Sequence, residues 1–102
     1  MEYFYHVTSG SGVDFSSGGD FVPLAAVDNL FGPEFGLARQ LKNDHEITNL
    51  AIIKRARGAT NLVEDWSPGG AMYDPFIADC LTALNLITAR GDTFKILGLA
   101  WH

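Results

Sequence analysis

The stretch "ITNLAIIKRARG", residues 47–58, decides the fold that the sequence predicts. Residues 47–53 are mostly apolar, and a run without regular alternation is typical of a strand that helices cover on both faces. The run stops at three basic side chains, Lys54, Arg55 and Arg57, and a glycine follows them. We therefore predict a buried strand that leads directly into a loop over residues 58–70.

Charge and composition restrict the partners of the chain. Its 102 residues fit one small domain, and its formal net charge of −5 argues against nucleic acid, because phosphate binding requires a basic face. At a strand end, the basic cluster is more often an ion-pair site or a solvated exit than a recognition patch. No apolar run approaches the roughly 18 residues of a membrane span, and the N-terminus lacks a signal-peptide pattern. We expect no nucleic acid and no membrane as partner.

A helix is predicted before the central strand, in "FGPEFGLARQLKND", residues 31–44. Pro33 suits the first helical turn, and Glu34 favours the positive end of the helix dipole. Three apolar residues recur at helical spacing, Leu37, Ala38 and Leu41. Asn43 and Asp44 are expected to end this helix.

A second helix is predicted in "YDPFIADCLTALNLITARGD", residues 73–92. We expect Asp74 to cap it, Pro75 to take its first position and Gly91 to follow its last turn. Its apolar stripe comprises Ile77, Cys80, Leu81, Leu84 and Ile87. The single cysteine excludes an internal disulfide, and its place on this stripe favours a buried, inert thiol over a nucleophile.

The remaining segments complete an α/β pattern. "EYFYHV" is β-rich, and residues 8–20 are predicted as a loop. Residues 21–30 contain Pro23 and are predicted as an edge strand or extended segment. "FKILGLAW", residues 94–101, is predicted as a second buried strand. Helix, strand, loop, helix and strand in this order make half of a doubly wound α/β fold with a parallel βαβ unit. We predict one partial domain over residues 1–102, with a loop-rich lead-in over 1–30 and an α/β core segment over 31–102.

The carboxyl ends of the two predicted strands indicate where a ligand would bind. In open parallel sheets the ligand crevice lies beyond these ends, which here carry Gly58 and the pair Trp101-His102. The Gly58 N–H could belong to an oxyanion hole, or the glycine could simply form a tight turn. Thr60 and Asn61 could bind the same ligand or close an Asx turn, and Trp66 could stack on a sugar or cover the core.

Other candidates for catalysis are weak. Glu64 and Asp65 are adjacent and point apart in an extended loop, and His6 and His45 have no partner at metal-ligand spacing. None of the loop serines lies in a G-x-S-x-G elbow: Ser9, Ser11, Ser16, Ser17 and Ser67. The residues predict no metal site and no organic cofactor.

Four segments in order resemble the sialate O-acetylesterase-like domain, a branch of the SGNH hydrolases that includes carbohydrate acetyl esterases. They are "FGPEFGLARQL" (31–41), "IIKRARGATNL" (52–62), "DWSPGG" (65–70) and "FKILGLAWH" (94–102). The resemblance covers roughly residues 20–102. It implies a three-layer α/β/α, flavodoxin-like fold with a parallel sheet, incomplete in this chain.

The resemblance also implies an activity, the serine-dependent removal of O-acetyl groups from sugars without a cofactor. Gly58 matches the family's oxyanion-hole glycine, while Ala59 replaces a second glycine and Asn61 replaces a serine. The expected sugar-binding residues are Ala59, Thr60, Asn61, Trp66 and His102. The family's serine elbow is expected upstream of Met1 and its Asp and His downstream of His102, so this chain alone is expected to be inactive.

Two rival hypotheses assign the chain no catalytic role of its own. It could be a non-catalytic domain that binds a glycan or a protein partner, or a structural subunit that another chain completes. An apolar strand at 94–101 with an uncovered edge invites pairing with another chain. The sequence therefore also predicts self-association through this edge.

Overall fold

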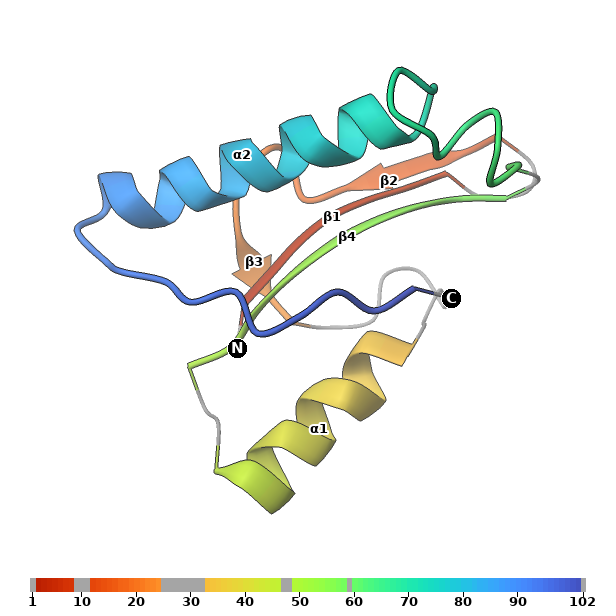
Figure 1. Cartoon of the computed structure of the whole chain (residues 1–102). Helices are drawn as coiled ribbons and strands as arrows, with labels where there is room; N and C mark the ends of the chain where they lie inside the picture. The colour runs from red at the N-terminus through yellow and green to blue at the C-terminus, as the bar shows by residue number, and fades with distance from the viewer. Residues whose placement is uncertain (1, 9–11, 25–32, 47–48, 59, 102) are drawn as a thin grey trace.

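The computed structural model describes residues 2–8, 12–24, 33–46, 49–58 and 60–101. The order of elements along the chain is β1 (Glu2–Thr8), β2 (Asp14–Ser16), β3 (Val22–Pro23), α1 (Pro33–His45), β4 (Ala51–Arg57) and α2 (Tyr73–Ala89). Figure 1 shows the sheet between the two helices, with α2 along one side and α1 inclined away from the other.

Strand β1 is the centre of the sheet. It pairs in parallel with β4 along its whole length, from Glu2 opposite Ala51 to Thr8 opposite Arg57. Its other edge is shared by β2, which is antiparallel to residues 6–8, and β3, which is antiparallel to residues 2–3. A run of aromatic residues followed by β-branched ones favours a strand at this position. The central strand thus comes from the first ten residues of the chain.

The predicted fold class, a three-layer α/β/α domain with a parallel sheet, is wrong. The domain is small, with two helices and a mixed four-stranded sheet in which two of the three strand pairings are antiparallel. One antiparallel pairing arises because residues 8–20, predicted as a loop, carry β2, which folds back on β1. The other is made by β3, which lies in the predicted edge segment 21–30. The parallel pair does exist, but β4 has β1 as its partner and not the predicted strand at 94–101.

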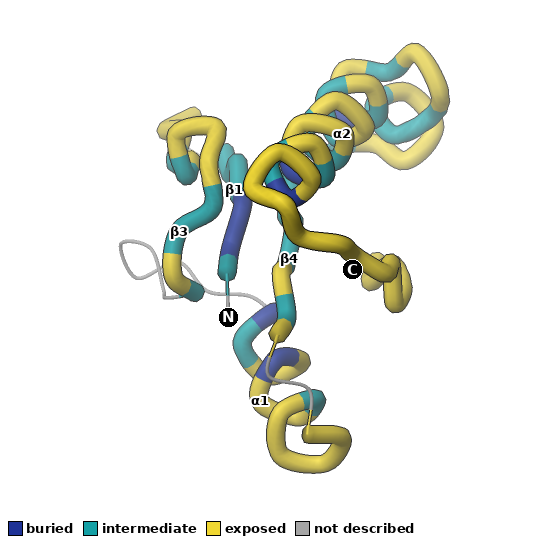
Figure 2. Tube along the Cα trace, turned by 90° about the vertical axis from the view of Figure 1, so that its left-hand side faces the viewer, coloured by how far each residue is buried: buried dark blue, intermediate teal, exposed yellow. Residues whose placement is uncertain are grey.

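The predicted buried strand at 94–101 is also absent. These residues form no regular element, and their side chains are exposed. Figures 1 and 2 show the segment leaving α2 and running beside β4, in the direction of that strand. No hydrogen bond joins it to the rest of the described chain. Apolar character alone therefore does not place this segment in the sheet.

Alternation along the central pair of strands directs side chains to opposite helices. Tyr3 contacts Glu34 and Phe35 of α1, and Lys54 of β4 reaches the same helix. Arg55, the next residue of β4, reaches Asp79 of α2. Successive side chains of a strand point to opposite faces, so each helix is anchored to its own face of the sheet.

The helices follow the predicted segments with shifted details. Helix α1 begins at Pro33 as predicted and runs to His45, one residue beyond the expected end. Helix α2 begins at Tyr73, and its N-cap is Met72 without a side-chain cap, so the prediction that Asp74 caps the helix is wrong. Gly91 follows the last turn with φ +85° and donates to the Thr88 carbonyl, as predicted.

The buried apolar core is thin. Among the described residues it comprises Tyr3, Phe4, Ala38, Met72, Ala83 and Ile87. The predicted stripe of α2 is only partly correct, because Leu81 is 58% exposed while Ala83, outside the stripe, is completely buried. Helix α2 therefore packs through a narrow line of small and medium side chains.

Candidate functional site

The loop over residues 58–70 follows the carboxyl end of β4, beside the carboxyl end of its parallel neighbour β1 (Figure 1). Gly58 continues the pairing of these strands, because its N–H donates to the Thr8 carbonyl at 3.4 Å. A donor in an oxyanion hole must face the reacting oxygen. In this structure the Gly58 N–H faces the chain's own backbone, so an oxyanion role requires this long hydrogen bond to open.

Asn61 and Asp65 hold the loop together. The Asn61 Oδ1 accepts hydrogen bonds from the N–H groups of Val63, at 2.8 Å, and Glu64, at 3.2 Å. Asp65 Oδ2 accepts from the Asn61 N–H at 2.7 Å. This is the Asx-turn arrangement that the sequence left open as an alternative to ligand binding. The Asn61 amide oxygen is therefore occupied within the loop.

Asp65 also joins the loop to α2. Its backbone carbonyl accepts hydrogen bonds from the N–H groups of Met72, at 2.8 Å, and Tyr73, at 3.0 Å. Glu64, its neighbour, is exposed. Asp65 is thus bonded within the loop, whereas Glu64 faces solvent. The two acids do not form a carboxylate pair.

Trp66 is half-buried and connects three segments. Its Nε1–H donates to Thr60 Oγ1 at 3.1 Å, and its ring meets Phe76 of α2 and Trp101 edge to face, with centroids 6.2 and 5.0 Å apart. The Thr60 hydroxyl in turn donates to the Arg57 carbonyl at 3.1 Å. Trp66 thus covers the start of α2, while Trp101, 58% exposed, presents the open aromatic surface.

The predicted sugar-binding residues are only partly placed by the structure. Loop 58–70 brings Thr60 and Trp66 together, with Asn61 in the same loop. Ala59 and His102 lie outside the described residues. Thr60 and Trp66 are bonded to each other and the Asn61 Oδ1 is bonded to backbone N–H groups, so each of the three placed side chains has a hydrogen-bond partner within the loop.

Gly70 is the position at which this loop tolerates no side chain. A Cβ there would lie 2.5 Å from the Asp65 carbonyl oxygen and 2.6 Å from that of Glu64. Gly70→Ala is expected to lower the free energy of unfolding by about 2 kcal/mol, because backbone atoms must move. Urea unfolding measures the loss. Gly36→Ala is the control: open space surrounds Gly36, which lies inside α1, and a small gain of about 0.5–1 kcal/mol is expected. An equal effect of both changes would contradict the crowded loop.

The strongest electrostatic cluster lies between β1, β4 and α1. Glu34 is only 7% exposed, and its Oε1 accepts from the Tyr3 hydroxyl at 2.9 Å. Lys54 Nζ lies 3.0 and 3.1 Å from the two carboxylate oxygens. Burial raises the pKa of Glu34, but hydrogen bonds from its own backbone N–H, Lys54 and Tyr3 outweigh burial and lower this pKa overall. Burial and the adjacent carboxylate raise the pKa of Tyr3 strongly.

Sequence reasoning missed this cluster. Glu34 was assigned only to the helix dipole, and nothing in the spacing of Tyr3, Glu34 and Lys54 indicates contact. The sequence left an ion-pair site and a solvated exit open for the basic cluster. The structure shows ion pairs for Lys54 with Glu34 and for Arg55, whose Nη1 lies 2.8 Å from Asp79 Oδ2. All these partners belong to the chain itself, so the two ion pairs hold α1 and α2 against the sheet.

A serine, a histidine and an aspartate lie close together on the β1–β2 hairpin, another arrangement that the sequence did not indicate. His6 is opposite Ser16 across the strands, and His6 Nε2 lies 3.8 Å from Asp14 Oδ1. The Ser16 hydroxyl accepts from the Gly18 N–H at 3.3 Å, and Asp14 accepts from Thr8 at 2.6 Å. No hydrogen bond links Ser16 to His6 in the described chain, so this group lacks the connection that activates a serine.

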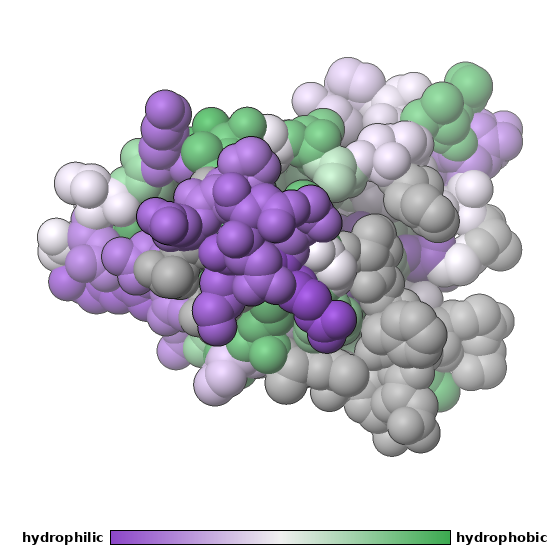
Figure 3. All heavy atoms as spheres, turned by 90° about the horizontal axis from the view of Figure 1, so that it is seen from below, coloured by the Kyte–Doolittle hydropathy of each residue, from purple (hydrophilic) through white to green (hydrophobic). Residues whose placement is uncertain are grey.

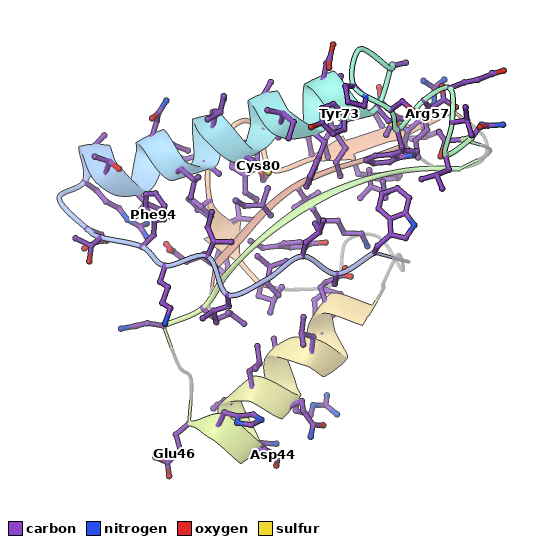
Figure 4. All side chains as sticks on the ribbon, viewed as in Figure 1. Asp44, Glu46, Arg57, Tyr73, Cys80 and Phe94 are labelled. Atoms are coloured by element: carbon purple, nitrogen blue, oxygen red, sulfur yellow. The ribbon has the colours of Figure 1, made fainter. Side chains whose placement is uncertain are left out.

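Cys80 points from α2 towards the sheet and is half-buried (Figure 4). Burial, and to a lesser degree the charge of Asp79, raises the pKa of its thiol. A thiol with a raised pKa is a poor nucleophile, which agrees with the inert role predicted from the sequence.

Within the described ranges, no group of His, Cys, Asp and Glu is arranged to hold a metal ion, and no helix is long and apolar enough to cross a membrane.

Exposed apolar side chains concentrate after α2. We call residues 94–101 the apolar edge segment; its exposed large side chains are Phe94 (48%), Ile96 (70%), Leu97 (59%), Leu99 (74%) and Trp101 (58%). Figure 4 shows Phe94 where the segment leaves the end of α2. Figure 3, which looks onto the α1 side, shows hydrophobic atoms along the margin of a mostly hydrophilic face. An extended row of this kind is typical of an interaction surface.

No protein-family model, curated protein or solved structure matches this chain. Its function is therefore argued from its own residues.

Proposed function

We propose that this chain is a non-catalytic domain that binds a protein partner through the apolar edge segment. The observation that carries the proposal is the exposure of five large apolar side chains within eight consecutive residues. The backbone of the same residues has no hydrogen-bond partner in the described chain. An extended segment with unpaired backbone groups and apolar side chains binds by adding a strand to a partner.

The surface area of the chain supports this proposal. A folded monomer of 11.1 kDa is expected to expose about 5,700 Å². This chain exposes 7001 Å². The surplus of about 1,300 Å² exceeds the roughly 800 Å² that one partner contributes to a stable protein interface. The chain therefore carries enough uncovered surface for a specific complex.

The chemistry of the segment favours a protein over a glycan. Lys95 is the only charged residue within it, and its other side chains offer apolar surface apart from the indole N–H of Trp101. Sugars require several directed hydrogen bonds, whereas strand addition obtains its hydrogen bonds from the backbone. A protein strand thus satisfies both the backbone and the side chains of this segment.

Esterase chemistry is the second candidate, and one observation favours it. Loop 58–70 lies at the carboxyl ends of two parallel strands, which is where α/β enzymes bind their ligands, and Trp66 of this loop contacts Trp101. In this alternative the loop belongs to a serine-dependent carbohydrate O-acetyl esterase, with Gly58 in the oxyanion hole. The hydrogen bond from the Gly58 N–H to the Thr8 carbonyl weighs against it, because it occupies the donor that the oxyanion hole needs.

Two measurements on the full chain test the first proposal. Amide hydrogen exchange at submicromolar concentration is expected to show residues 94–101 unprotected while β1 and β4 are protected. Assays with p-nitrophenyl acetate are expected to show no turnover above background. Protection of 94–101 in the dilute chain would contradict the binding surface. Turnover that Ser16→Ala abolishes would contradict the non-catalytic assignment and also the expectation that the esterase serine lies outside this chain.

A further inference from the structure

We infer that the partner of the apolar edge segment is a second copy of this chain, joined by antiparallel pairing of the two segments across a two-fold axis. This inference rests on the proposed function and names the partner. A two-fold axis brings the same surface of both copies together and sets paired strands antiparallel. The segment provides an extended backbone without hydrogen-bond partners on each copy.

The position of the segment allows such pairing. It runs along the outer side of β4, on the opposite edge of the sheet from β2 and β3 (Figures 1 and 2). It is therefore the outermost extended element of the described chain on this side. Two copies can approach edge to edge through it without displacing any described strand.

Charge favours self-pairing at this place. The chain as a whole carries −5, so two copies repel each other over most of their surfaces. Residues 93–101 contain no acid and a single basic residue, Lys95. In an antiparallel register centred on Leu97, Lys95 lies opposite Leu99, which separates the two lysines by roughly 14 Å. The segment is thus a stretch at which two copies can meet with little repulsion.

Area agrees with a dimer. The surplus of about 1,300 Å² per chain is larger than the roughly 800 Å² per subunit of a standard interface. Burial of the five exposed apolar side chains of the segment against their counterparts provides the apolar centre of the interface.

Sedimentation velocity of the full chain between about 1 and 100 µM tests the inference, because this range covers micromolar dissociation constants. We expect a concentration-dependent monomer–dimer equilibrium. Leu99→Lys is expected to weaken it at least about tenfold, since it places a charge within the apolar contact. Val63→Lys is the matched control, because Val63 and Leu99 are both 74% exposed and Val63 lies in the loop. A monomer throughout, or equal effects of the two changes, would overturn the inference.

A cysteine experiment tests the geometry. In a Cys80→Ala background, Leu97→Cys places one thiol next to the two-fold axis, within the distance that a disulfide requires. Rapid covalent dimerisation is expected for this variant, and little for Lys95→Cys, whose thiols lie far apart in the same register. Equal rates for both variants would overturn the antiparallel pairing. A persistent monomer whose residues 94–101 remain unprotected would overturn only the second copy as partner and leave the proposed binding function intact.

Discussion

Replacing Phe4 by alanine is expected to lower the free energy of unfolding by about 3–5 kcal/mol, the usual loss for a buried phenylalanine. Phe4 lies in the central strand, is only 4% exposed and meets Phe21 edge to face with ring centroids 5.8 Å apart. Its place in β1 is opposite Ile53. Few large side chains of the described residues are buried, so few neighbouring side chains can move into the cavity that the truncated residue leaves.

Urea unfolding followed by circular dichroism measures this loss. Phe94→Ala is the matched control, because Phe94 is 48% exposed and its truncation leaves no cavity. We expect it to cost less than about 0.5 kcal/mol. If both alanine variants unfold at the same urea concentration, Phe4 does not belong to the core and the position of β1 at the centre of the sheet is wrong.

Lys54→Met is expected to destabilise the domain by about 3 kcal/mol, because it leaves the buried carboxylate of Glu34 without a cation. Tyr3 would then be the remaining side-chain donor to this carboxylate. The double variant Glu34→Gln/Lys54→Met is expected to recover most of the loss, since a neutral amide can still accept from Tyr3 and needs no cation. A double variant as unstable as Lys54→Met would show that the charge of Glu34 is unimportant.

The pH dependence of this cluster gives an independent check. The folded-state pKa of Glu34 lies below its ordinary value of 4.5, so its ion pair stabilises the fold above this pH and the contribution is lost as the pH falls through the folded pKa. In Lys54→Met the pKa of Glu34 rises, because burial remains while the cation is gone. The stability difference between the two proteins should therefore shrink on acidification. A constant difference from pH 7 to about pH 3 would contradict the ion pair.

Local patterns predicted the elements better than their pairing. Proline at the start of α1 and glycine after α2 indicate these helices through local residues. The apolar run correctly indicates a strand, but the prediction that this strand is buried and stops at the basic cluster is wrong, because β4 contains that cluster and is only half-buried. Which strands pair depends on contacts far apart in the sequence. The aromatic residues of β1 and the apolar edge segment were both compatible with a place beside β4, and only β1 occupies it.

In the candidate site, too, local features could be predicted from the sequence and long-range contacts could not. The sequence identified loop 58–70, and its Asx-turn alternative describes the hydrogen bonds of Asn61. It could not reveal that the Gly58 N–H continues the β1–β4 pairing, because that bond depends on the partner strand. The buried Glu34 cluster could not be predicted for a related reason. Its ion pair joins residues 20 positions apart and its hydrogen bond from Tyr3 joins residues 31 positions apart, and such contacts leave no periodic signal in the sequence.

The parallel pairing of β1 with β4 also determines when the domain can fold. Every residue of β1 finds its β4 neighbour 49 positions later in the chain, so the centre of the sheet is closed by a long-range contact. Until the ribosome has released residue 57, the aromatic side chains of β1 have only β2, β3 and α1 as described neighbours. Long-range pairing is slow because chain entropy is lost before the contacts form. The nascent chain thus leaves the aromatic central strand without its parallel partner until β4 has been synthesised, a period in which chaperone binding would be most effective.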